Sequence, residues 1–215
     1  MEAVMKGLTV SIVALSLTFG AAVRVWAGEM PLSPQARELK SLLVSLKESP
    51  KDRVTQTQYL QKFPKDIGAF RRLFDASDFS ELYDGADYIF VLKQLAEDHP
   101  DVVGEILIGL SQNAPSGADA LSFLRQVTVE YGVKHTFIFA KILNKRSAKQ
   151  SSALVRYLAD VENHHAYPEY SQIITNLRKA NEHALAKQFE ASRTERTKRK
   201  GHGKLRDEPN IPGGV

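Results

Sequence analysis

The chain of 215 residues contains no cysteine. Such a chain forms no disulfide, binds no metal through thiolates, carries no lipid on cysteine and uses no cysteine nucleophile. It also lacks a Gly-x-Gly-x-x-Gly sequence, a Walker loop and a Gly-x-Ser-x-Gly motif, which are the usual signatures of nucleotide binding and of serine hydrolases. These absences favour a non-enzymatic protein without a cofactor.

The sequence also lacks a convincing pair of β-strand patterns, whereas apolar residues recur at helical spacing along most of it. Ser33 and Pro34 predict the capped start of one helix, and Pro100 predicts the first residue of another. We expect helices over 34–48, 54–63 and 66–74, after a capping box at Asp78–Glu81, and from Pro100 onward. The fold class is therefore all-α, with about eight helices.

The second half of the chain continues the helical pattern. Gly132 is expected to end one helix, and 137–143, which is nearly all apolar, is interpreted as a helix rather than a buried strand. A last helix is expected to run from Pro168 through Leu185. Pro100, Gly132 and Pro168 are spaced by 32 and 36 residues, a period typical of stacked helix pairs. Two architectures stay open: an irregular α-α helical stack (HEAT-like) and an orthogonal helical bundle.

The N-terminal segment resembles an export signal. Residues 8–23 carry no charge and lie between Lys6 and Arg24, and this run is shorter than the roughly 20 apolar residues that span a bilayer. Val25 and Ala27 supply small residues at the two positions that a signal peptidase reads. We predict a signal peptide over 1–27, cut after Ala27, and a bacterial periplasmic or secreted protein; an uncleaved anchor is the alternative.

Basic charge is concentrated at the C-terminus. Residues 187–215 hold eight basic and four acidic side chains, whereas 28–186 hold 19 basic and 20 acidic ones. Because the apolar stripe vanishes there, we expect 192–215 to be a disordered basic tail. It lacks the aromatic residues on which nucleic-acid bases stack, so we expect no nucleic-acid partner. The candidate residues for binding a partner or anion are Arg193, Arg196, Lys198, Arg199 and Lys200.

A second polar group lies between residues 160 and 169. His164 and His165, with Glu162 or Glu169, are residue types that bind zinc or copper. Their spacing does not match the motifs that place two ligands on one helical face. The simpler interpretation is a polar helix end, where the helix dipole favours histidine.

The sequence therefore predicts an exported all-α domain over 28–191 that acts by binding another macromolecule, without catalysis. A protein partner, as for an immunity or inhibitor protein, is the leading hypothesis. Contact of the tail with an anionic surface is a further expectation, and we expect no transmembrane span after the signal. The alternative is a metal-binding protein or metal-dependent hydrolase that uses the His164 and His165 region.

Overall fold

The computed structural model describes residues 33–73, 85–115, 121–160 and 168–203, and of 196–203 only the backbone. These residues form ten α-helices and no strand, which confirms the all-α class. The helices are α1 (Pro34–Glu48), α2 (Arg53–Lys62), α3 (Ile67–Leu73), α4 (Ala86–Leu95), α5 (Pro100–Gln112), α6 (Ser122–Lys134), α7 (Thr136–Asn144), α8 (Ala148–Ala159), α9 (Pro168–Lys179) and α10 (His183–Gly203). None of the helices among these residues is long and apolar enough to cross a bilayer.

Several helix starts follow directly from local sequence. Ser33 accepts a hydrogen bond from the Ala36 amide at the start of α1. Ser147 and Gln150 form both halves of a capping box at the start of α8. His99 stands at the N-cap of α5, but its ring bonds the Gln56 side chain at 3.0 Å and leaves the helix end uncapped by a side chain. Local capping residues and proline therefore determine where these helices begin.

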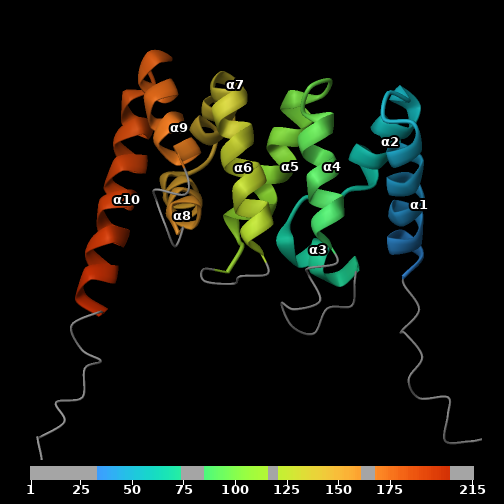
Figure 1. Cartoon of the computed structure of the whole chain (residues 1–215), viewed down its shortest axis with the longest axis horizontal. Helices are drawn as coiled ribbons and strands as arrows, with labels where there is room; N and C mark the ends of the chain where they lie inside the picture. Colours follow the sequence, from blue (N-terminus) through green and yellow to red (C-terminus); the bar gives the residue numbers. More distant parts are fainter. Residues whose placement is uncertain (1–32, 74–84, 116–120, 161–167, 204–215) are drawn as a thin grey trace, which may run out of the picture. The chain divides into compact units, whose positions relative to one another are not determined.

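The helices from α4 onward pack in two rows. One row contains α4, α6 and α9, the other contains α5, α8 and α10, and α7 packs against α5, α6 and α9. Figure 1 shows the helices side by side, with α1 and α2 at one end and α10 at the other. α1 packs on α2, and the Tyr59 hydroxyl of α2 donates a hydrogen bond to the Tyr88 carbonyl of α4. Each row is thus a series of neighbouring helices.

The buried core contains aromatic groups at both ends of the helix series. Phe63 lies between Tyr59 and Phe70, with ring centroids 5.5 and 5.8 Å away. In the C-terminal helices, Phe189 of α10 is fully buried and lies 5.5 Å from the Tyr170 ring and 6.2 Å from the Phe139 ring. Such rings bury the largest apolar areas of any side chains, so these groups hold the outer helices to the rest.

Two predicted helix boundaries in the second half are wrong. Gly132 does not end its helix, since α6 continues to Lys134. A Cβ at Gly132 would collide with Ile173 of α9, so the glycine serves close helix packing instead. The helix expected from Pro168 through Leu185 breaks at Asn181, which has φ 63°, while the Glu182 amide bonds the Leu177 carbonyl. Asparagine tolerates this left-handed conformation, which closes α9 with a Schellman-type cap.

The C-terminal prediction also differs from the structure, because α10 continues through residue 192 to Gly203. Packing of Leu185, Ala186 and Phe189 fixes the first turns of the helix. Once a helix is nucleated, residues such as Arg, Lys and Glu extend it at little cost. Residues 204–215 and the predicted signal peptide over 1–27 lie outside the described residues.

Candidate functional site

A cleft of about 600 Å³ lies along the facing sides of α4 and α6. Its apolar lining comes from Phe90, Ala96 and Tyr131. Phe90 is 40 % exposed although its ring lies 6.3 Å from that of Phe123. An aromatic side chain that is held on one side and open on the other is a ready contact for an incoming apolar group.

Two ion pairs cross this cleft. Lys93 Nζ of α4 lies 2.7 Å from Glu130 Oε2 of α6, and Lys134 of α6 pairs with Glu97, which follows α4. Gln126 also donates a hydrogen bond to the other Glu130 oxygen at 3.0 Å. From the first ion pair to the second, the residue number rises by four on both segments. α4 and α6 therefore run in the same direction. The charged rim of the cleft is therefore neutralised within the protein.

Tyr131 and His135 occupy the end of the cleft nearest α5. The Tyr131 hydroxyl donates a hydrogen bond to the Pro100 carbonyl at 2.8 Å, and the two rings lie 5.0 Å apart. Burial raises the pKa of Tyr131, and burial lowers the pKa of His135 against the opposing effect of Glu97. Both side chains are consequently neutral near pH 7. The His135 Nε2 atom is buried without a hydrogen-bond partner among the described residues.

The sequence interpretation missed this cleft because exposed helix charges are common. One pattern could have indicated it: Lys93 and Glu97 are spaced by four residues, and Glu130 and Lys134 repeat that spacing with the charges in the opposite order. Such complementary pairs match when two helices lie parallel and in register. The pattern becomes informative only when α4 and α6 are known to be neighbours.

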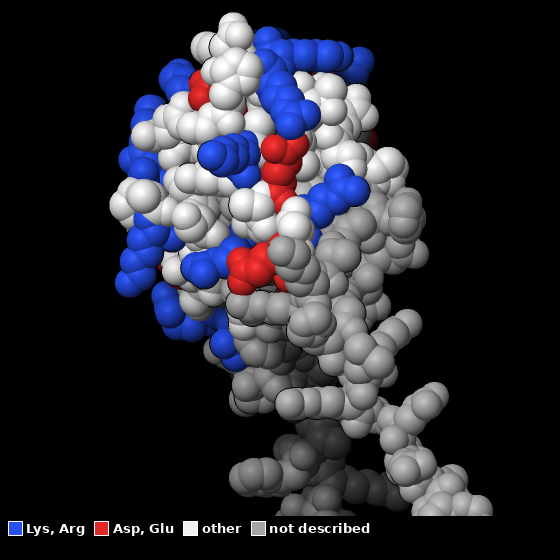
Figure 2. Space-filling view, turned by 90° about the vertical axis from the view of Figure 1, so that its left-hand side faces the viewer, with Lys and Arg blue, Asp and Glu red and all other residues white. Residues whose placement is uncertain are grey.

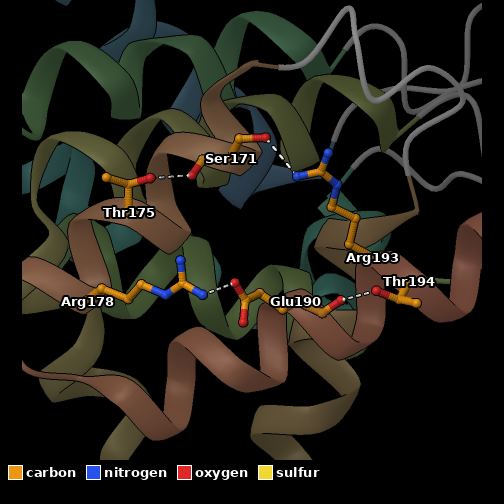
Figure 3. A network of polar contacts seen from close by, with 6 residues as sticks. All are labelled: Ser171, Thr175, Arg178, Glu190, Arg193 and Thr194. Atoms are coloured by element: carbon orange, nitrogen blue, oxygen red, sulfur yellow. Dashed lines mark hydrogen bonds and ion pairs between the residues drawn. The ribbon is translucent and has the colours of Figure 1, made fainter.

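The predicted basic residues divide into two sets. Arg193 is half-buried and its Nη1 donates to Ser171 Oγ at 3.0 Å, while Arg178 of α9 pairs with Glu190 of α10 (Figure 3). Arg193 therefore helps to join α9 and α10. The other predicted residues follow it on the backbone of α10, and their side chains lie outside the described part: Arg196, Lys198, Arg199 and Lys200.

The alternative metal site falls mostly outside the described residues, since 161–167 contains Glu162, His164 and His165. Asp160 is buried, with its carboxylate 4.0 Å from the Arg125 guanidinium, and Glu169 is half-buried in the first turn of α9. Within the described ranges, no three His, Asp or Glu side chains gather as a metal-binding group.

Comparison of this chain with known protein families, characterised proteins and solved structures gives no match.

Proposed function

We propose that this chain is an exported, non-enzymatic protein that acts by binding another protein in the α4–α6 cleft. The observation that carries the proposal is the exposed Phe90 beside an apolar cleft whose rim charges are already paired. Protein interfaces combine a small apolar centre with a polar rim, and aromatic side chains supply much of their binding energy. We expect the partner to insert an aromatic or aliphatic side chain next to Phe90 and Tyr131.

The chemistry of the cleft supports binding over catalysis. Its lining contains no serine, threonine or cysteine that could act as a nucleophile. Each carboxylate of the lining faces a lysine, and the Tyr131 hydroxyl is engaged with Pro100. General acid–base catalysis needs a group with a pKa near the working pH and free access to substrate, which the paired carboxylates and Tyr131 do not offer. His135 also lines the cleft, but its Nε2 atom is buried.

The helix packing supports the finer architecture of an α-α stack. α4, α6 and α9 form one row of neighbours and α5, α8 and α10 the other, as in stacked helix pairs. Such stacks bind partners along the exposed side of one row, which here contains the cleft. An immunity or inhibitor protein that covers the active site of an effector is the specific form that we propose, with export through the signal over 1–27.

Site-directed crosslinking tests the proposal. We expect benzoylphenylalanine at position 90 to crosslink one envelope protein of the host. The same group at position 137, where Phe137 is 74 % exposed on α7, is the matched control and should leave that protein free. With the purified partner, Phe90→Ala should weaken binding by at least about tenfold, as for an interface hot spot, and Phe137→Ala should not. Equal behaviour at both positions would refute the cleft as the binding site.

A further inference from the structure

The three helices α8, α9 and α10 carry exposed cations that have no acidic partner among the described residues. We call Lys149, Arg156, Lys179 and Lys187 the basic end; all four are exposed, and none forms an ion pair with a described residue. Figure 2, which views the molecule from the side of α10, shows Lys and Arg spread widely over this side with few Asp or Glu among them. Uncompensated cations of this kind create a positive potential that reaches beyond contact distance.

α10 extends this charge beyond its packed turns. Leu185, Ala186 and Phe189 form its buried stripe. Positions 193, 196 and 200 continue the same stripe at spacings of three and four residues, and there the residues are arginine or lysine. Over 193–203 the helix holds five Lys or Arg and one Glu. The stripe thus changes from apolar to basic without a break in the helix.

The basic end also lacks the features that a protein or nucleic-acid partner would need. The large exposed apolar side chains lie on α1, α2, α4, α5 and α7, so α8–α10 offers none among its described residues. Protein interfaces depend on such anchors. Over 190–203 there is no Phe, Tyr or Trp on which a base could stack. The basic end is therefore a broad cationic surface, and the partner that complements it is a broad anionic surface.

We propose that the basic end and the 193–203 segment of α10 bind the anionic phospholipid surface of a bilayer by electrostatic attraction alone. No apolar residue occurs over 193–203, so the helix contacts lipid headgroups and does not insert into the acyl region. Attraction of this kind is screened by salt within about 10 Å at 0.1 M ionic strength. The proposal is independent of the cleft and of the protein that would bind there.

Vesicle binding by the full chain tests this proposal. The probes are vesicles of phosphatidylcholine with and without phosphatidylglycerol, and the basic variant replaces four residues by glutamine: Arg196, Lys198, Arg199 and Lys200. Each Lys or Arg near an anionic leaflet contributes about fivefold to binding, so the basic variant should bind at least about 100-fold more weakly. Binding of the unchanged chain should require phosphatidylglycerol and should decrease as NaCl is added.

The matched control replaces two arginines and two lysines that are exposed on or beside α1 and α2: Arg37, Lys40, Lys51 and Arg53. It loses the same net charge, and every chain keeps the same N-terminal segment, so a difference between the two variants reports the location of the charge. Circular dichroism verifies that both variants fold. Equal loss in both variants, binding to neutral vesicles at the same affinity, or tighter binding to an oligonucleotide or to polyglutamate would overturn the proposal.

Discussion

In the cleft between α4 and α6, Lys93 and Lys134 each face a glutamate of the neighbouring segment, whereas the lysines of the basic end have no such partner among the described residues. Large exposed apolar side chains are distributed the opposite way, with Phe90 at the cleft and none on α8–α10 in the described part. Because the rim charges of the cleft are neutralised, binding there depends on shape and apolar contact. Binding at the basic end depends on long-range charge, which is less selective and is sensitive to salt.

The largest expected effect is a loss of stability when the packing of α10 against the other helices is disrupted. Phe189→Ala removes a fully buried ring that touches Tyr170 and Phe139. We expect the free energy of unfolding to fall by about 3–5 kcal/mol. Urea denaturation measures this loss, and trypsin should cut within α10 sooner than in the unchanged chain.

Phe137→Ala is the control for that substitution, because Phe137 is exposed. It should change stability by no more than about 0.5 kcal/mol. If α10 and the cleft are separate regions, Phe189→Ala should raise amide hydrogen exchange in α8–α10 more than in α4. Equal acceleration in α4 would contradict their independence.

The next effect concerns the cleft alone. A Cβ at Gly104 of α5 would collide with the Tyr131 hydroxyl and lie 2.7 Å from Ile142 Cδ1. Gly104→Ala should therefore displace Tyr131 and cost about 1–3 kcal/mol, as overpacking does in other cores. Thermal unfolding gives the stability, and partner binding should weaken while vesicle binding stays unchanged.

Gly68→Ala on α3 provides the matched comparison. The nearest atom to its Cβ is Asp66 Oδ1 at 3.2 Å, which accepts the Ala69 amide hydrogen bond and would need to shift by only a few tenths of an ångström. Because alanine favours a helix over glycine, we expect stability to be unchanged or higher by up to about 1 kcal/mol. A loss as large as that of Gly104→Ala would mean that backbone freedom, and not contact with Tyr131, explains both results.

A smaller effect is expected from the ion pair between Glu97 and Lys134, whose side chains are more than half exposed. A double-mutant cycle with Glu97→Gln and Lys134→Gln should give a coupling energy of about 0.2–1 kcal/mol that decreases with added salt. A coupling of zero would show that the rim of the cleft is not held by this pair.

The smallest effect is the pH dependence that comes from His135. Burial lowers the pKa of His135 in the folded chain, so below about pH 6.5 the unfolded chain takes up the proton first. The stabilising contribution is complete above that pH and is lost as pH falls toward the folded pKa. His135→Gln should therefore flatten the decline of the unfolding midpoint below about pH 6.5. If the decline is the same in His135→Gln, other titratable groups cause it.

The sequence predicted the helices better than the site. Ser33, Pro34 and Pro100 act locally, and their helices begin where expected. Gly132 and Asn181 were misjudged because one depends on contact with Ile173 and the other on a left-handed cap. The cleft could not be predicted, since it exists only where α4 and α6 lie side by side. The continuation of α10 to Gly203 depends on the anchoring of its first turns by Phe189.

The salt dependence of binding to phosphatidylglycerol vesicles tests most directly whether the basic end binds by charge, independently of the α4–α6 cleft. We predict that the unchanged chain and Phe90→Ala bind alike and lose affinity equally as NaCl rises. The basic variant with glutamine at 196, 198, 199 and 200 should bind weakly at every salt concentration. A loss of vesicle binding in Phe90→Ala, or binding by the unchanged chain that does not respond to salt, would contradict the account.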